Sequence, residues 1–511
     1  MSSFGKHTLG RAGTLRRIIS HVQHNSWWYE RSTNPRRGTS AGRTWHAGRV
    51  TTDRYELVGI FGGAVDAGVA SLFVGAGLSA AAGLPSWGDL LGPLAAEIGV
   101  AGEFADLPLL AEYYEQNGPG RRPALENHLR NVLSEYRTPA ESHRLIAKLP
   151  IDEIWTTNFD SLLEAAAPDA SVAVHDNDAL DIGTGRRTII KMHGSLSLDT
   201  PSVWTAPPVI TRSDFEQYEE THPRMWALLR ASYLTRTMLF LGFSFADPNI
   251  DVLLRLARRY GTTAADRHLT ALRRPADPKD IQLHELRVRD LENSGVHVCE
   301  MSDFSELTPM LRAITTRTRP ERLFVSGSGD TSQLKPWYDK LAVALTARPP
   351  SWQLASLGGP AGWGVTSRLA ELLRASGRYT PDRFRIYFGK NPREHTPLMD
   401  AHFGTAIFTD LEREELVGSV LDNCRALLVI CGGSGTTEEV RLALERGVSV
   451  IPLAASGATA RAVWDSSATP PDLGGRPCDP QVWHNLADPD PDIAVMAAIT
   501  AIDQAMCRPR T

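Results

Sequence analysis

The sequence predicts an α/β protein with two Rossmann-like domains, each built on a parallel sheet. Three observations lead to this prediction. Short apolar segments of strand length alternate with amphipathic segments of helix length along most of the 511 residues. Several apolar segments run directly into glycine-rich turns. The pattern restarts after the segment TRTRPE at 316–321, which divides the chain into blocks at 55–317 and 318–511.

Residues 1–54 stand apart from both blocks. They carry ten Lys or Arg against two acidic residues and show almost no hydrophobic periodicity. Such a segment has little apolar surface to bury, so we expect a basic and disordered extension.

The first block opens with apolar residues at three- to four-residue spacing from Glu56 to Val65, which predicts a helix. A strand at 71–74 follows. Further helices are expected near 87–99, 106–117, 121–136 and 140–148, and strands in DEIWTT, RTIIKMHG, TMLFLGFS and RHLTALRR. The second block places strands in RLFVSGSG, WQLASLGG, FRIYFGKN, ALLVICGG and VSVIPLAA, and a final helix in DIAVMAAITAIDQAM. Helices between successive strands indicate parallel sheets.

Composition excludes several classes of protein. Hydrophobic residues make up 42% of the chain, which is too many for a disordered protein, and the net charge of -5 gives no case for nucleic-acid binding. The five cysteines form no C-x-x-C pair, so a structural zinc site is not expected. No apolar run is long enough for a membrane span, and no signal-peptide core is visible. We therefore expect a cytoplasmic protein.

A glycine turn follows the first predicted strand. In FVGAGLSAA, Gly75, Gly77 and Ala80 form a G-x-G-x-x-A pattern between a strand and a helix. Glycines at such a turn let backbone N–H groups approach a pyrophosphate at the start of the helix. The acidic residue of a standard dinucleotide domain is missing about 20 residues later, so a plain dehydrogenase is disfavoured.

Polar residues follow three other predicted strands of this block. Asn158 and Asp160 lie in TTNFDSLL, and His193 ends the strand of KMHGSL. The segment FLGFSFADPNI brings Gly242, Ser244 and Asp247 to a strand end. Ligands of open parallel sheets bind at the carboxyl ends of strands, although helix capping or packing would also explain each residue taken alone.

These four segments, in this order, resemble the sirtuin-like NAD-binding family, and in particular its bacterial branch without a zinc module. Deacylating sirtuins continue with G-I-P-D-F-R, where this chain has Leu84, Ser86 and Trp87 in GLPSW, and they carry two C-x-x-C pairs. These departures put a groove for acyl-lysine peptides in doubt. The resemblance then implies NAD+ as substrate and water as acceptor, with no metal and no other cofactor.

The resemblance also implies roles for individual residues. Asn158 would orient the water or the ribose hydroxyls, and His193 would be the general base. Asp160 would hold its loop or contact the nicotinamide end. The remaining candidates would bind the phosphates, namely Gly75, Ala76, Gly77 and Ser79, and the adenosine half, namely Gly242, Ser244 and Asp247.

A second glycine-rich turn lies in the second block. ALLVICGGSGTTEEVRLAL reads as a strand, a turn and a helix, and resembles the P-G-G-x-G-T-x-x-E motif of the SLOG superfamily with Cys431 in place of proline. Gly432, Gly433, Gly435 and Thr436 could bind phosphate, and Glu439 could bind ribose hydroxyls. The turn at Gly358 and Gly359 is the second glycine turn expected of this superfamily. Cations for the phosphates could come from Lys390, Arg413 and Arg425.

A zinc-free sirtuin-like domain followed by a SLOG domain resembles the NADase effector family of bacterial Thoeris antiphage systems. This resemblance implies that a cyclic ADP-ribose isomer, made by a TIR-domain partner protein, binds the SLOG domain and switches on NAD+ hydrolysis. It also implies a homotetramer or larger assembly. Three alternatives remain open: an NAD-dependent protein deacylase, a nucleotide phosphoribohydrolase acting in the second block, and a non-catalytic sensor of ADP-ribose-type nucleotides.

Overall fold

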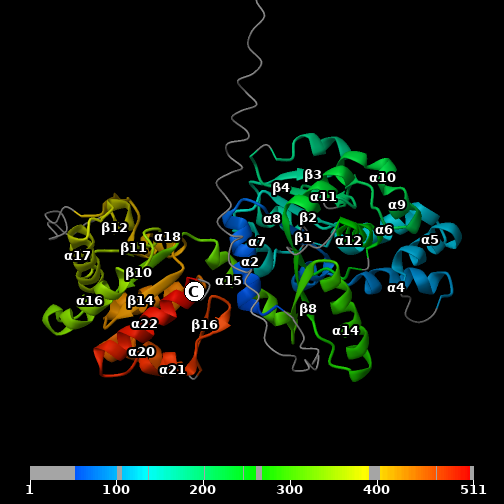
Figure 1. The fold of residues 1–511 in the computed structure, drawn as a ribbon. Coiled ribbons are helices and arrows are strands. Elements are labelled where there is room, and N and C mark those ends of the chain that lie inside the picture. Colours follow the sequence, from blue (N-terminus) through cyan, green and yellow to red (C-terminus); the bar gives the residue numbers. More distant parts are fainter. Residues whose placement is uncertain are drawn as a thin grey trace, which may run out of the picture. The chain divides into compact units, whose positions relative to one another are not determined.

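The computed structural model of the chain contains two parallel sheets, each covered by helices on both faces (Figure 1). It describes residues 52–100, 106–135, 137–183, 185–200, 202–245, 247–260, 268–390, 403–467 and 469–506. The α/β class predicted from the sequence is therefore confirmed. The extension predicted at residues 1–54 lies outside the described residues apart from 52–54. Asp53 caps the first described helix through a hydrogen bond from the Glu56 N–H, so the folded chain begins before the predicted boundary.

The first sheet has seven strands in the order β3-β4-β2-β1-β7-β8-β9, and every neighbouring pair is parallel. The chain builds outward from β1 on one side and then crosses to β7 on the other. Such a change of direction is the point where open α/β sheets bind ligands. The strands are β1 (Ala70–Val74), β2 (Glu153–Thr156), β3 (Ser171–Ala173), β4 (Thr188–Lys191), β7 (Thr237–Leu241), β8 (His268–Arg273) and β9 (Val296–Met301).

Successive side chains of β1 enter different cores, because side chains alternate across a strand. Leu72 and Val74 pack with helices α2 (Arg54–Asp66), α7 (Glu141–Ala147) and α15 (Leu307–Arg317). Phe73 packs on the other face with α11 (Pro223–Thr235), α12 (Pro248–Tyr260) and α14 (Pro278–Asn293). Both faces of the strand are buried, which explains its continuous apolar sequence.

A helical insert joins β1 to β2 and has a small core of its own. It consists of α4 (Trp87–Glu97), α5 (Leu107–Asn117) and α6 (Arg121–Leu133). The predicted helices at 87–99, 106–117, 121–136 and 140–148 match α4 to α7 within three residues at every end. The described elements before Arg317 also include α3 (Ala76–Ser79), α8 (Leu162–Ala166), α9 (Arg212–Glu216), α10 (Tyr218–Thr221) and the hairpin of β5 (Ser195–Leu196) and β6 (Trp204–Ala206).

The second sheet has six parallel strands in the order β13-β12-β11-β10-β14-β15, again with a change of direction, here between β10 and β14. Its strands are β10 (Arg322–Ser326), β11 (Gln353–Ser356), β12 (Phe384–Phe388), β13 (Thr405–Phe408), β14 (Ala426–Ile430) and β15 (Ser449–Leu453). Helices α16 (Thr331–Leu345), α17 (Pro360–Ala375), α21 (Pro480–Asn485) and α22 (Pro491–Ala505) cover one face. Helices α18 (Arg413–Leu421), α19 (Ser434–Glu445) and α20 (Ala458–Asp465) cover the other.

The predicted domain boundary at 317/318 falls between the end of α15 and the start of β10. A short hairpin, β16 (Asp472–Leu473) with β17 (Arg476–Pro477), precedes α21. Within the described ranges, no helix is both long enough and apolar enough to cross a bilayer.

Candidate functional site

The glycine turn after β1 packs directly against the turn after β7. The Gly75 N–H donates to the Leu241 carbonyl and the Gly77 N–H to the Gly242 carbonyl, each at 2.9 Å. A Cβ atom on Gly75 would lie 2.6 Å from the Gly242 oxygen, and one on Gly77 would lie 2.9 Å from the Gly242 Cα. Close contact between two backbones therefore requires these glycines. Their predicted phosphate contacts stay a prediction, because both N–H groups already have partners inside the protein.

Asn158 lies beside this turn in the loop that follows β2. Its Nδ2 donates to the Gly75 carbonyl at 3.1 Å and to the Ser79 Oγ at 3.0 Å, while Ser79 donates to the Asp160 carboxylate at 2.8 Å. Asn158 is buried, and its Oδ1 has no hydrogen-bond partner among the described residues. The two acceptors thus fix the amide, and its oxygen remains available to a donor from a ligand.

A buried lysine stabilises the loop that carries Asn158. Lys191 is fully buried at the end of β4, and its ammonium pairs with Glu164 at 2.8 Å. The same ammonium donates to the carbonyls of Phe159 and Asp160. Two hydrogen bonds from one side chain therefore fix the loop backbone that follows Asn158, and the ion pair with Glu164 holds the ammonium in place. Sequence analysis did not predict a role for this lysine, because it reads as part of an apolar strand.

His193 follows β4, the neighbour of β2 in the sheet. Its side chain is 1% exposed, and its ring meets those of Phe215 and Tyr218 edge-on, with centroids 4.9 and 5.9 Å away. Its carbonyl accepts the Val209 N–H at 2.8 Å. Neither ring nitrogen has a hydrogen-bond partner among the described residues. Like Asn158, His193 therefore presents polar atoms that a ligand could satisfy.

Asp247 approaches His193 from the other half of the sheet. One carboxylate oxygen, Oδ2, lies 3.6 Å from the His193 Nε2, and Oδ1 accepts the N–H groups of Asn249 and Ile250 at the start of α12. Burial lowers the pKa of His193, and the Asp247 carboxylate opposes this shift. Burial likewise raises the pKa of Asp247, against the effects of His193 and the two N–H groups. The structure thus places Asp247 against His193, and the adenosine contact that the resemblance implies stays a prediction.

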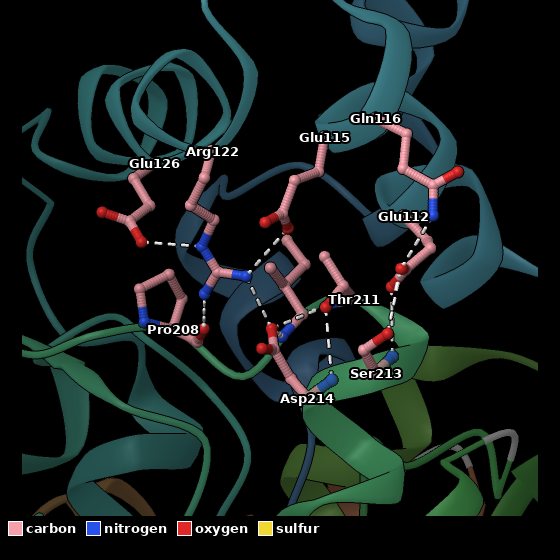
Figure 2. Close-up of polar contacts among 10 residues, drawn as sticks. Glu112, Glu115, Gln116, Arg122, Glu126, Pro208, Thr211, Ser213 and Asp214 are labelled. Carbon is pink, nitrogen blue, oxygen red and sulfur yellow. Dashed lines mark hydrogen bonds and ion pairs between the residues drawn. The ribbon is translucent and has the colours of Figure 1, made fainter.

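Arg122 joins the helical insert to the segment 208–214, which contacts His193. Figure 2 shows the Arg122 guanidinium of α6 between Glu126, Glu115, the Pro208 carbonyl and Asp214, at 2.5 to 3.3 Å. Burial would raise the pKa of Asp214, but hydrogen bonds from the N–H groups of Ile210 and Thr211 and from Arg122 lower it. The same segment contains Val209 and leads to Phe215, both of which contact His193.

Three aromatic side chains meet beside the Asn158 loop. Phe159 lies 5.9 Å from Trp87 of α4 and 5.7 Å from Trp204 of β6, measured between ring centroids. The Nε1 of Trp204 is buried without a hydrogen-bond partner in the described part of the chain. The sequence did not predict this cluster, because its members come from three separate segments.

The structure brings most sequence-predicted residues of the first block to one edge of the sheet. Ala76 begins α3, and Ser79 ends it. Ser244 is exposed in the loop after β7, in contrast to the buried Asn158 and His193. Among the described residues, no group of three or more His, Cys, Asp or Glu could hold a metal ion.

The second sheet has its own glycine-lined edge between β10 and β14. The Gly432 N–H donates to the Ser328 carbonyl at 2.8 Å. Glu439 of α19 is buried, accepts the Ser326 hydroxyl and pairs with Arg413 at 2.5 Å. Burial raises the pKa of Glu439, and Ser326 and Arg413 oppose the shift. The carboxylate expected to bind ribose thus has protein partners, whereas the Arg413 side chain is 60% exposed.

The other predicted members of this second site lie in different places. Gly358 and Gly359 join β11 to α17, Gly433 caps α19, and Gly435 and Thr436 lie in its first turn. Lys390 follows β12 and pairs with Glu412 at 3.3 Å on the surface.

The prediction for Arg425 is wrong. Arg425 immediately precedes β14, at the end opposite the Gly432 turn. Its side chain is 3% exposed and donates to the carbonyls of Arg319 and Met506, so it fastens chain segments together. Because its guanidinium already donates to backbone carbonyls inside the protein, Arg425 is not available to bind a phosphate.

Comparison with known proteins gives consistent matches. The family profile of the SIR2-like domain matches residues 152–297. An NAD(+) hydrolase ThsA of Enterococcus faecium is 33% identical over 323 residues, which is 58% of this chain and 66% of that protein. The Bacillus cereus protein of the same name is 26% identical over 424 residues, 78% of this chain and 86% of the relative. A third, from Acinetobacter baumannii, is 32% identical over 273 residues, half of this chain and 55% of the relative.

Proposed function

We propose that this chain, a SIR2-like protein related to the NAD(+) hydrolases named ThsA, hydrolyses NAD+ to ADP-ribose and nicotinamide. One observation supports this above the others. Asn158 and His193 follow neighbouring strands at the carboxyl edge of the sheet and are buried, and both carry polar atoms without a partner in the described chain. This pair suits hydrolysis of an N-glycosidic bond, because a neutral amide can orient a reactant and an imidazole can take a proton.

The reaction follows from these groups. The bond between the ribose carbon and the nicotinamide nitrogen breaks, its electron pair leaves with nicotinamide, and positive charge develops on the ribose. The Asn158 Oδ1 accepts a hydrogen bond from a ribose hydroxyl or from the attacking water. Water adds to the ribose carbon, and His193 takes the proton that this addition releases. Because burial lowers the pKa of His193, the imidazole is neutral near pH 7 and able to accept that proton.

Nicotinamide release from NAD+ by the purified chain tests the proposal. Asn158→Ala and His193→Ala should each lower the rate at least about 100-fold, since acid–base groups contribute about 10²- to 10⁴-fold. Asn117→Ala is a matched control, because Asn117 is exposed on α5 and, among the described residues, its side chain donates to the carbonyl of Tyr113 in the same helix. Release that survives both substitutions would refute the site. Turnover only with an acyl-lysine peptide would indicate a deacylase, and binding without turnover would indicate a sensor.

We further propose that the second block is a SLOG domain that senses a cyclic ADP-ribose isomer, made by a TIR-domain partner, and switches the first site on. Supporting this, the exposed guanidinium of Arg413 lies beside the glycine turn, 3.1 Å from where a Gly435 side chain would begin. A shift from about 1% to 99% active requires the signal to bind the active state more tightly by roughly 5.5 kcal/mol. In a homotetramer or larger assembly, several signal-binding sites could together supply this free energy. Loss of NAD+ from infected cells would then provide antiphage defence.

The switch has a separate test. Nicotinamide release is compared with and without cyclic ADP-ribose isomers in the wild type and in Arg413→Ala. The signal should raise the rate, and the variant should need at least about tenfold more signal, since a charge-assisted contact to phosphate contributes about 1.5–3 kcal/mol. An equal rate with and without every isomer would remove the switch and leave the hydrolase proposal intact. Nucleoside monophosphates as additional substrates would indicate a phosphoribohydrolase in the second block.

A further inference from the structure

We infer that Asp247 is a positioning residue for His193: its carboxylate fixes the imidazole in one tautomer and stabilises the imidazolium formed during the reaction. The inference rests on the proposed function for its catalytic part. The inference rests on a largely buried carboxylate, 10% exposed, that is aimed at a buried imidazole with no other polar contact among the described residues.

The carboxylate is itself held in place. Its Oδ1 accepts two N–H groups of the first turn of α12, from Asn249 at 2.9 Å and from Ile250 at 3.4 Å. This leaves Oδ2 directed at the His193 Nε2, 3.6 Å away. The rings of Phe215 and Tyr218 confine the imidazole edge-on, so it has little freedom to turn away. A small closing movement would bring the two groups to hydrogen-bond distance.

The geometry assigns each ring nitrogen a task. With Nε2 facing a carboxylate, the neutral imidazole carries its proton on Nε2, and Nδ1 keeps a lone pair for the substrate. In the reaction, Nδ1 takes the proton that is released when water adds to the ribose carbon, and the ring becomes a cation whose Nε2–H still faces Asp247. The carboxylate offsets the cost of creating that charge in a buried place.

Other charged groups surround the imidazole. Asp214 of α9 favours its protonated form, and His222, just before α11, disfavours it. Tyr218 of α10 also contacts the ring and stacks on His222 with centroids 4.6 Å apart. Asp214 is already paired with Arg122 at 2.8 Å, so its charge is largely neutralised. Asp247 is therefore the main negative group acting on His193.

Two other roles for Asp247 make different predictions. A helix cap alone would affect stability and not catalysis, and a contact to the adenosine half would affect KM and not kcat. Asp247→Asn separates these roles, because asparagine caps helices as well as aspartate does but has no charge. Asp277→Asn is the matched control, since Asp277 caps α14 by accepting the Lys279 N–H at an exposed position.

The experiment measures nicotinamide release by the full chain, in the presence of whichever cyclic ADP-ribose isomer activates it. Asp247→Asn should lower kcat at least tenfold and change KM less than threefold. The carboxylate raises the pKa of His193, so its loss should move the acidic limb of the pH profile to lower pH. Asp247→Glu should recover part of kcat, and Asp277→Asn should match the wild type. An unchanged kcat, or a change in KM alone, would overturn the inference.

A second measurement does not depend on activity. In protein labelled with 15N-histidine, the His193 signals, assigned with His193→Gln, should show the neutral Nε2–H tautomer, and Asp247→Asn should weaken that preference. A mixed or Nδ1–H tautomer in the wild type would overturn the inference even if the chain hydrolyses NAD+. Conversely, a wild type that releases no nicotinamide under any condition would refute the proposed function, while the tautomer would still report on the pair.

Discussion

Replacing Lys191 by methionine should destabilise the first block and weaken catalysis together. Methionine keeps most of the length and apolar surface of the lysine stem but has no charge and no N–H donor. The substitution leaves the Glu164 carboxylate buried without its cation, 2.8 Å from where the ammonium lay. It also removes the donor to the carbonyls of Phe159 and Asp160, which follow Asn158 in its loop.

The magnitude follows from burial. Lys191 is 0% exposed and the Glu164 side chain 6%, so solvent cannot replace the lost partner. Removing one member of such a pair costs about 3–5 kcal/mol. At about 2–4 °C per kcal/mol for a domain of this size, the first thermal transition should fall by roughly 6–20 °C. The loosened Asn158 loop should lower kcat more than it changes KM.

The matched variant combines Lys191→Met with Glu164→Gln. It removes the unpaired charge of Glu164 but does not restore the N–H donors of Lys191. It should recover about a third to three fifths of the loss in the melting temperature, because the remaining cost is two hydrogen bonds at about 1 kcal/mol each out of about 3–5 kcal/mol. Differential scanning calorimetry of the two single variants, the double variant and the wild type completes the cycle. A Lys191→Met transition within about 2 °C of the wild type would refute the reasoning.

Three further substitutions test other parts of the structure. His268 is fully buried, its Nδ1 accepts the Met238 N–H at 3.2 Å, and burial lowers its pKa to about 4. In the unfolded chain the imidazole of His268 binds a proton below about pH 6.5, whereas in the folded chain it stays neutral down to about pH 4. The free energy of unfolding should therefore fall by about 3 kcal/mol between pH 6.5 and pH 4. Urea unfolding should show a smaller fall in His268→Asn. Arg122→Met should detach the segment 208–214 and lower kcat severalfold, whereas Arg130→Met on the same helix should match the wild type in nicotinamide release. Gly242→Ala should cost at least about 2 kcal/mol, because φ is +61° and the new Cβ would lie 2.3 Å from the Leu78 nitrogen; an unchanged melting temperature would contradict this.

The fold could be predicted from the sequence where apolar runs are long and buried on both faces. The strands β1, β2, β4, β7 and β8 are of this kind, as are β10, β11, β14 and β15. In the two large sheets, the strands that escaped prediction are β3, β9 and β13, three of the four edge strands, and the short strands of the two hairpins escaped as well. An edge strand can be partly exposed, so its sequence can mix polar and apolar residues and resemble a loop. Thr405–Phe408, for example, has no buried residue in its strand.

The candidate site was predictable as a set of strand ends but not as a set of contacts. Asn158 and His193 each follow an apolar strand, and parallel strands bring their carboxyl ends to one edge, so their approach could be inferred. The contact of His193 with Asp247 could not be inferred, because β4 and β7 are separated in the sheet by β2 and β1. Arg425 failed for a related reason: a basic residue next to a strand looks the same in sequence at either end.

The sequence by itself determined the spacing of apolar residues in each helix and strand, the turns that needed glycine, and the polar side chains that follow each strand. These are local properties, set by side-chain alternation, backbone conformation and residue type. Only the tertiary structure decided the order of the strands, and with it the partners of each polar group. Lys191 reads as part of an apolar strand, and its pairing with Glu164 exists because the fold brings α8 to the end of β4. Packing of distant segments settles such choices, since it is governed by the whole buried surface.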